Sequence, residues 1–317
     1  MYQEFFGLRE NPFRVNPDPR YLFLTPGTQE ALASLAYGIR NRYGIILMTG
    51  EVGTGKTTLL HAIIDGLRQT QAVTAFIFNS RLGAGGFFNM LMTDFGILCE
   101  SKTKSEKLFR LNQWLWERFR AGQTAVLIVD EAQNLSVEVL EEIRLLTNLE
   151  TSTEKLLQIV LSGQPELEVK LKRTELRQLR QRIAIHCRTA ALSHEETQGY
   201  IFKRLSIAGA EGRPIFSPEA IESIHLYSQG IPRVINILCE NALIHAFADQ
   251  ISLVSAAYIT EVAKDLDLDG AELDVSLTGR EHPQNPGHWD HSRGRLGDAG
   301  LSSPRTPAVA RGGENER

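Results

Sequence analysis

Residues 50–58 have the sequence GEVGTGKTT, and this short segment constrains the fold of the chain more than any other. It matches the pattern G-x-x-x-x-G-K-[ST], in which a glycine-rich loop joins a strand to a helix and surrounds a phosphate group. Gly50 and Gly55 permit backbone conformations that a Cβ would exclude. The sequence therefore predicts a phosphate-binding loop, and the alternative is a glycine-rich turn that matches by accident.

The chemistry of this loop predicts ATP and Mg²⁺ as ligands. Backbone amides from Gly53 to Thr58 would turn toward the β-phosphate, and a helix that starts near Lys56 would add the positive end of its dipole. The Lys56 ammonium would bridge the β- and γ-phosphates, while the Thr57 hydroxyl would bind Mg²⁺. The loop residues expected to bind ATP are Gly50, Gly53, Thr54, Gly55, Lys56, Thr57 and Thr58.

The segments on both sides of the loop favour the same interpretation. Residues 43–49 form a short apolar run that leads into the loop, and apolar residues recur at helical spacing over 59–67. Strand, glycine loop and helix follow one another in the order that the motif requires.

A second motif supplies two carboxylates. The apolar run 125–129 suits a parallel strand buried on both faces, and it ends in Asp130 and Glu131. Ligands of open α/β sheets bind at this end of the strands. We expect Asp130 to hold Mg²⁺ together with Thr57, and Glu131 to orient and polarise the attacking water. The alternative is a strand that stops at a charged turn.

Two further strands end in polar residues. The run 156–161 is expected to lie between the two motif strands, which would place Gln164 beside the γ-phosphate as a sensor, with Ser162 as the second choice. A capped helix start before Pro165 is the alternative for this segment.

The run 73–78 ends at Asn79, which would hydrogen-bond Glu131 and keep it from the water until a partner docks. An asparagine at the end of a strand is also a common turn residue.

Arginines predict two further contacts with the nucleotide. Phosphoryl transfer relies on positioned cations, and one can come from a neighbouring subunit. Arg182 is the first candidate for such a finger and Arg180 the second, with a solvated helix face as the alternative. Arg233 follows Gly230 and Pro232, which mark a helix boundary, so it would lie early in a helix and reach back to the γ-phosphate.

Periodicity along the chain predicts an α/β fold. Helices are expected at 28–41, 56–69, 85–98, 104–121, 136–150 and 165–182, and strands at 44–49, 72–78, 124–130, 156–162 and 183–188. Such alternation indicates a parallel sheet with helices on both faces. The expected organisation is a P-loop ATPase domain at 1–190, an all-α lid of four helices at 191–267 and a disordered tail at 268–317.

Composition restricts the setting of the protein. The chain has 317 residues, 42% hydrophobic content and a net charge of −4, and its three cysteines are scattered. We expect a cytoplasmic protein without a disulfide scaffold or a cysteine–histidine metal site. No apolar stretch reaches the roughly eighteen residues of a membrane span, and the first residues lack signal-peptide features. A basic cluster within 170–188 is expected to be solvated or to contact another subunit, with DNA binding as the less favoured interpretation.

Taken in order, these motifs resemble an AAA+ ATPase, and more narrowly the ExeA/GspA-like ATPases of bacterial secretion and pilus assembly. The resemblance covers residues 1–265 and includes the opening YQEFFGL, the phosphate-binding loop, GQPEL at 163–167 and GIPR at 230–233. It implies ATP-dependent homo-oligomers and a protein partner at the inner membrane, in a secretion, pilus or polysaccharide-export machine. The core also resembles transposition helper ATPases that act on DNA. A third hypothesis is a nucleotide-dependent scaffold with little turnover.

Overall fold

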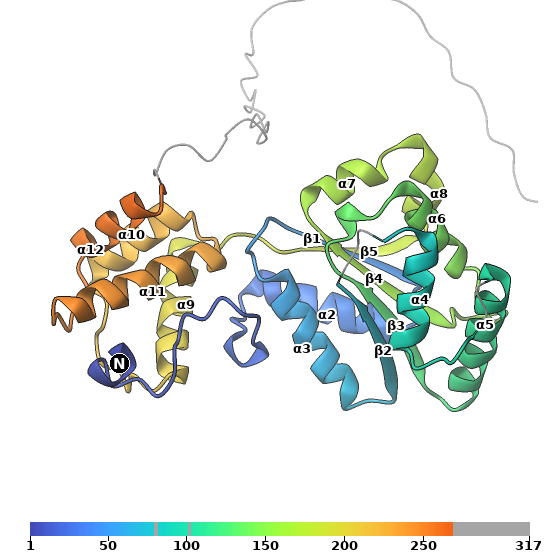
Figure 1. The fold of residues 1–317 in the computed structure, drawn as a ribbon, viewed down its shortest axis with the longest axis horizontal. Helices are drawn as coiled ribbons and strands as arrows, with labels where there is room; N and C mark the ends of the chain where they lie inside the picture. The colour runs from blue at the N-terminus through green and yellow to red at the C-terminus, as the bar shows by residue number, and fades with distance from the viewer. Residues whose placement is uncertain (79–81, 101–102, 269–317) are drawn as a thin grey trace, which may run out of the picture. The chain divides into compact units, whose positions relative to one another are not determined.

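In the part of the chain that the structure describes, five parallel strands form the central sheet, in the order β2-β3-β4-β1-β5 (Figure 1). The strands are β1 (Ile45–Thr49), β2 (Ala72–Ile77), β3 (Thr124–Val129), β4 (Leu157–Gly163) and β5 (Ile183–Arg188). β4 lies between β1 and β3, the two strands that carry the motifs, as the sequence predicts. The α/β class with a parallel sheet is therefore confirmed.

This computed structural model describes residues 1–78, 82–100 and 103–268. All of them lie within one compact unit, residues 1–272. Asn79 and residues 269–317 lie outside the described residues, so the expectations for that asparagine and for the tail stay predictions. No described helix is long and apolar enough to cross a membrane.

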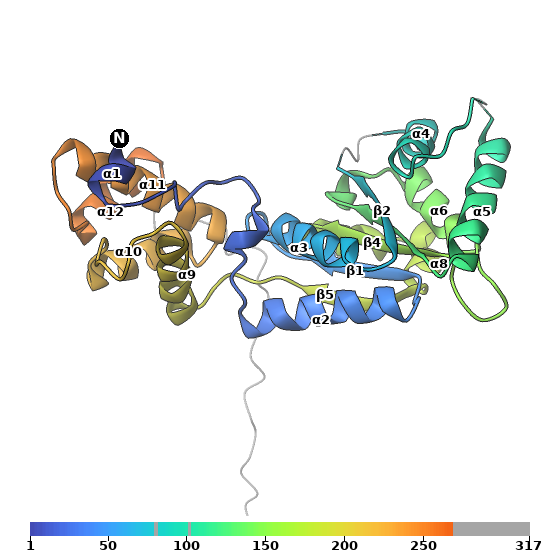
Figure 2. The same ribbon diagram turned by 90° about the horizontal axis from the view of Figure 1, so that it is seen from below.

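Helices cover both faces of the sheet (Figure 2). Successive residues of a strand point to opposite faces, so Ile46 and Met48 pack with α2 (Pro26–Arg40) and α3 (Lys56–Arg68). Ile45 and Leu47 pack on the other side. That side is covered by α4 (Ala84–Asp94), α5 (Lys104–Arg120), α6 (Val137–Leu146), α7 (Pro165–Leu171) and α8 (Arg177–Arg180).

The expectation of one helix over 165–182 is wrong, because the chain breaks between α7 and α8. Arg173 is extended, and a short 3-10 helix, Thr174–Leu176, follows it. At about 100° per residue, a continuous helix would turn Leu176 half a turn away from Leu167. Both leucines are fully buried in the same core cluster. The break brings both side chains into that core.

Within the described residues, four helices follow β5, and we refer to them as the lid: α9 (His194–Ile207), α10 (Pro218–Ser228), α11 (Pro232–Ala248) and α12 (Ala256–Asp265). Local signals set their starts. Ser193 and Glu196 form a reciprocal capping box at α9, and Ser217 caps α10 ahead of Pro218. The helix starts that the sequence predicts in this region are therefore found in the structure.

The N-terminal segment packs with the lid, whereas the sequence assigns it to the ATPase domain. After α1 (Tyr2–Phe5), the side chains of Phe6, Leu8 and Phe13 join the buried core formed by α9 to α12. The Tyr2 hydroxyl donates to the Glu240 carboxylate at 2.8 Å and 2.9 Å. Periodicity could not reveal this, because the contacts join segments more than 180 residues apart.

Candidate nucleotide-binding site

The loop between β1 and α3 has the backbone that a phosphate-binding loop needs. Gly53 and Gly55 have φ of +82° and +94°, in the left-handed region that favours glycine. Gly50 is required for another reason. A Cβ there would lie 2.0 Å from Oγ1 and 2.6 Å from the carbonyl oxygen of Thr189, the residue after β5. The Thr54 hydroxyl also contacts the Thr189 hydroxyl, at 2.7 Å, so the loop is fixed against the end of β5.

Lys56 is the buried cation of the loop. Its Nζ donates to the carbonyl oxygens of Gly50 at 2.7 Å and Glu51 at 2.9 Å. Burial lowers the pKa of Lys56, and the nearby carboxylates of Glu131 and Asp130 oppose that shift. An ammonium that carbonyl oxygens hold at the N-terminus of a helix fits the role of phosphate ligand. Thr57 and Thr58 line the same cleft as Lys56 and fit that role as well.

Asp130 lies directly after β3, and its carboxylate accepts three hydrogen bonds. Its Oδ2 accepts from the Thr57 hydroxyl at 2.8 Å, and its Oδ1 accepts from the Ser162 hydroxyl at 2.8 Å and from the backbone N–H of Glu131 at 3.0 Å. The paired carboxylate and hydroxyl oxygens suit Mg²⁺, which prefers hard oxygen ligands. Ser162, the second choice for the sensor, holds Asp130 in this structure.

Glu131 is held by two glutamines. It has φ of +53°, and its Oε2 accepts from Gln133 Nε2 at 2.6 Å and from Gln164 Nε2 at 3.2 Å. Gln164 lies at the end of β4 as predicted, but its amide contacts Glu131; a role beside the γ-phosphate stays a prediction. The sequence reasoning missed Gln133. The feature that could have revealed Gln133 is its place two residues after Glu131, in the short 3-10 helix Ala132–Asn134 that follows the two carboxylates.

The lid meets the loop directly. The backbone N–H of Arg233, in the first turn of α11, donates to the Gly53 carbonyl at 3.2 Å. A Cβ on Gly53 would lie 2.8 Å from the Arg233 Cβ. Arg233 therefore lies beside the phosphate-binding loop, and its contact with the γ-phosphate stays a prediction.

A cleft of about 430 Å³ joins these parts, a volume that suits a small-molecule ligand. The sequence reasoning missed much of its wall: the N-terminal segment 14–28 and the lid residues Tyr200, Arg204 and Asn236. These residues come from segments far apart in the sequence, so no local motif marks them.

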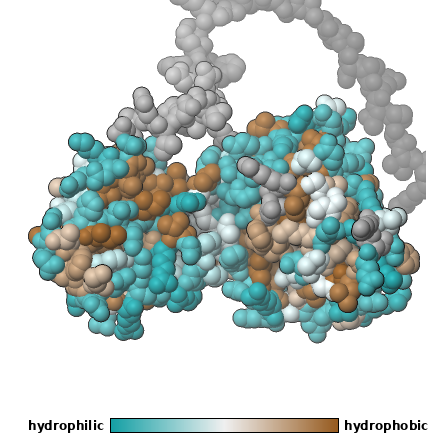
Figure 3. All heavy atoms as spheres, viewed as in Figure 1, coloured by the Kyte–Doolittle hydropathy of each residue, from teal (hydrophilic) through white to brown (hydrophobic). Residues whose placement is uncertain are grey.

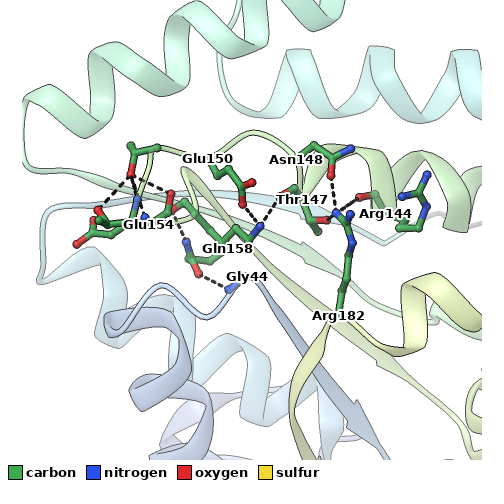
Figure 4. A network of polar contacts seen from close by, with 11 residues as sticks. Gly44, Arg144, Thr147, Asn148, Glu150, Glu154, Gln158 and Arg182 are labelled. Atoms are coloured by element: carbon green, nitrogen blue, oxygen red, sulfur yellow. Dashed lines mark hydrogen bonds and ion pairs between the residues drawn. The ribbon is translucent and has the colours of Figure 1, made fainter.

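The two arginines proposed as fingers differ in their surroundings, and Figure 4 shows those of Arg182. The Arg182 guanidinium donates to the Arg144 carbonyl at 3.3 Å, to the Thr147 hydroxyl, and to Asn148 Oδ1 at 2.6 Å, all at the end of α6. Arg180 is exposed on α8, and its side chain forms no hydrogen bond or ion pair within the described ranges. Arg182 thus satisfies the end of α6 within its own subunit, and its role as a finger stays a prediction.

Comparison with known proteins shows which families this chain resembles. Residues 39–171 match the family model described as "AAA domain". This part of the chain is similar to AAA domains. Over 249 residues the chain is 44% identical to General secretion pathway protein A of Aeromonas hydrophila. The resemblance predicted from the motifs is confirmed. The match covers 78% of this chain and 45% of that relative, so the chain spans about half the relative's length.

Solved structures show the same fold. The ORC2 protein of Aeropyrum pernix, in a structure of ADPNP–ADP complexes, matches with a TM-score of 0.61 and 16% identity, over 81% of this chain and 71% of that chain. The RuvB Holliday junction branch migration motor of Thermotoga maritima matches with a TM-score of 0.54 and 18% identity, over 80% and 73%. The structure of Drosophila ORC bound to DNA matches with a TM-score of 0.62 and 17% identity, over 84% of this chain and 66% of that chain. At these identities the likeness concerns the fold alone.

Proposed function

We propose that this chain binds ATP with Mg²⁺ and hydrolyses the bond to the terminal phosphate. The observation that carries the proposal is the placement of Asp130 and Glu131. Asp130 bonds the Thr57 hydroxyl of the phosphate-binding loop, and Glu131 lines the same cleft as Lys56. Asp130 and Thr57 can hold the cation together, while the adjacent carboxylate of Glu131 acts on water.

The bound nucleotide and its Mg²⁺ supply the electrophilic phosphorus and the charge that activates it. The chain's own residues would do the rest. Glu131 orients a water molecule and accepts its proton, and the amides of Gln133 and Gln164 hold that carboxylate in place. Lys56 and Arg233 offset the negative charge of the phosphates, and lid movement would pass the change to a partner.

The proposed setting is the assembly or regulation of a secretion, pilus or polysaccharide-export machine. The 44% identity to a general secretion pathway protein supports it. The protein would act in the cytoplasm as an ATP-dependent homo-oligomer, at the inner membrane through a protein partner.

Exchange of Glu131 for glutamine tests the reaction. E131Q keeps the shape of the side chain but removes the base, so ATP binding should persist while hydrolysis falls by about 10²-fold or more. E117Q, on the exposed side of α5, is the matched control and should leave both unchanged. Phosphate release and equilibrium binding of a fluorescent ATP analogue are the two measurements.

Other results would lead elsewhere. An E131Q protein that hydrolyses ATP at the parental rate removes the assignment of Glu131. If the parent binds ATP but turns over no faster than E131Q, with and without candidate partners, the nucleotide-dependent scaffold is supported instead. K56A should lose tight binding, because Lys56 provides the buried cation of the loop.

A further inference from the structure

The lid wall of the cleft contains a buried arginine, Arg204, which forms no ion pair with a carboxylate in the described part of the chain, although the charge of Asp18 lies near enough to interact with it. The residue is 6% exposed. Its guanidinium donates to the Pro12 carbonyl, to the Arg14 carbonyl at 3.1 Å and to the Tyr200 hydroxyl at 2.6 Å. It also lies 4.5 Å from the centre of the Tyr21 ring. Neutral oxygens and an aromatic face thus compensate the buried charge.

These contacts fix the direction of every hydrogen bond that follows. A guanidinium can donate but cannot accept, so the Tyr200 oxygen is the acceptor of the Arg204 bond. The hydrogen of Tyr200 is then left for Asn236 Oδ1, at 3.0 Å. Burial raises the pKa of Tyr200, although the charge of Arg204 opposes this, so the phenol keeps its hydrogen. The Asn236 amide is therefore held with Oδ1 toward Tyr200 and Nδ2 turned away.

Asn236 lines the nucleotide cleft, and its Nδ2 has no acceptor among the residues that the structure describes. It lies three residues after Arg233 on α11, which is about 4.5 Å further along the helix axis. Arg233 bonds Gly53 of the phosphate-binding loop, so Asn236 lies about one turn further along α11 from that contact. Tyr21 and the N-terminal segment line the cleft as well. With the phosphates in the loop, a nucleoside would lie in this part of the cleft.

We propose that Asn236 Nδ2 donates a hydrogen bond to an acceptor on the nucleoside part of the bound nucleotide, a purine ring nitrogen or a ribose hydroxyl oxygen. Tyr200 and Arg204 are positioning residues that present the donor and keep the amide from turning. The inference rests on the proposed function, because it requires that nucleotides bind in this cleft.

Binding of ATP and of inorganic tripolyphosphate separates the two ends of the cleft. N236A should weaken ATP binding by about five- to tenfold, the effect of one hydrogen bond, and leave tripolyphosphate binding unchanged. R233A should weaken both ligands. N241A is the matched control, because the Asn241 amide on the same helix donates to the Ile237 carbonyl. Equal losses of both ligands in N236A, or no loss of ATP, would overturn the proposal. A parent that binds neither ligand would instead remove the proposed function.

Y200F tests the positioning step, since it keeps the ring but frees the Asn236 amide. It should weaken ATP binding about threefold or more without changing tripolyphosphate binding. Melting temperatures measured in parallel report any loss of folding, which would lower the affinity for both ligands. An unchanged ATP affinity in Y200F would contradict the positioning role.

Analogues identify the acceptor. We would compare the 1-, 3- and 7-deaza forms of ATP with its 2′- and 3′-deoxy forms, each of which lacks one acceptor. The parent should lose affinity for one of them, and N236A should lose nothing further for that same analogue, because the two groups share one interaction. Fully additive losses for all five analogues would overturn the proposal.

Discussion

Gly50 shows how a single missing side chain can be required by a distant residue. A Cβ at this position would lie 2.0 Å from the hydroxyl and 2.6 Å from the carbonyl oxygen of Thr189. The hydroxyl could rotate away, but the carbonyl belongs to the chain that leaves β5 for the lid. The first glycine of the loop is thus set by a contact with β5, and the loop and the lid connection are coupled through it.

G50A should therefore lower both stability and nucleotide affinity. We expect a loss of about 1–3 kcal/mol, typical of an overpacked site. G66A is the matched control: a Cβ at Gly66, inside α3, meets nothing within 4 Å, so it should stabilise by about 0.5–1 kcal/mol. Urea denaturation of the parent, G50A and G66A measures the two changes in stability, and binding of a fluorescent ATP analogue measures the change in nucleotide affinity. A G50A protein as stable as the parent would show that Thr189 moves freely.

The sequence assigned Thr57 and Asp130 to one expected Mg²⁺ site, because each residue belongs to a local motif. The structure adds their direct hydrogen bond, which forms because the sheet brings the two motifs together. Gln133, Tyr200 and Asn236 were not predicted. Their roles depend on which way a side chain points and on which distant segment lies opposite, and neither is written in the local pattern.

At the scale of elements, one carboxylate joins three parts of the ATPase domain. Glu168 on α7 accepts from the Thr49 hydroxyl of β1 at 2.6 Å and from the Arg188 guanidinium of β5 at 2.9 Å and 3.2 Å. His186 Nε2 lies 3.3 Å from the same carboxylate. Burial lowers the pKa of His186, so at neutral pH the cationic partner of Glu168 is Arg188. Thr49 directly precedes the phosphate-binding loop, so this network supports the loop from behind.

The network predicts a pH-dependent contribution to stability. Burial alone would raise the pKa of Glu168, but the hydrogen bonds from Arg188 and Thr49 hold it below its ordinary value of 4.5. A carboxyl with a lowered pKa in the folded state stabilises above its unfolded pKa and loses that contribution as the pH falls through the folded one. E168Q should therefore cost about 1.5–3 kcal/mol at pH 7.

The difference between E168Q and the parent should shrink below pH 4.5. Urea denaturation at pH 7 and at a series of lower pH values measures it. E175Q is the control, because Glu175 makes an exposed ion pair with Arg173 at 3.8 Å and should change little. A difference that stays constant down to pH 3 would show that the carboxylate charge contributes nothing.

Elements with strong periodicity were predicted to within a few residues, as in α3 and β3. The segment 165–182 was not, because its leucines follow a helical pattern in two parts that are out of phase with each other. Burial of Leu167 and Leu176 in one core favours a break over a continuous helix.

At the scale of the whole molecule, assembly depends on which arginine can reach another subunit. The contacts of Arg182 with the end of α6 favour Arg180, which is exposed, as the residue that acts in trans. We expect R180A and E131Q each to be inactive. Mixtures of the two should regain part of the activity, at interfaces where an intact Glu131 meets an intact Arg180.

Steady-state ATPase assays over a range of mixing ratios measure this recovery. R182A serves as the comparison: it should lower stability through α6, and its mixtures with E131Q should recover nothing beyond what dilution allows. Recovery with R182A but not with R180A would restore Arg182 as the finger. No recovery with either arginine would contradict a finger supplied in trans.

The surface bears on the choice between a protein partner and DNA. Figure 3 shows a mostly hydrophilic face with groups of apolar residues over both the lid and the ATPase domain. Exposed apolar residues of the lid include Leu226 on α10 and Ile244 on α11. In the basic cluster at 170–188, Lys170 donates to the Gln133 and Leu135 carbonyls. Together with the ion-paired Arg188 and with Arg182, this removes much of the cluster's capacity to bind phosphates, and the net charge of −4 adds to the effect.

We therefore expect little binding to duplex DNA at physiological salt, with or without nucleotide. Anisotropy of a labelled duplex, measured from about 50 to 200 mM salt, tests this, because each neutralised phosphate releases counterions and makes affinity fall with salt. The non-hydrolysable ATP analogue is added in a parallel series. A protein that acts on a secretion or export machine should give weak binding that the analogue does not change. Cooperative DNA binding that appears only when the analogue is present would favour the DNA-bound transposition helper. Nucleotide would then promote assembly of the protein on DNA rather than on a protein partner.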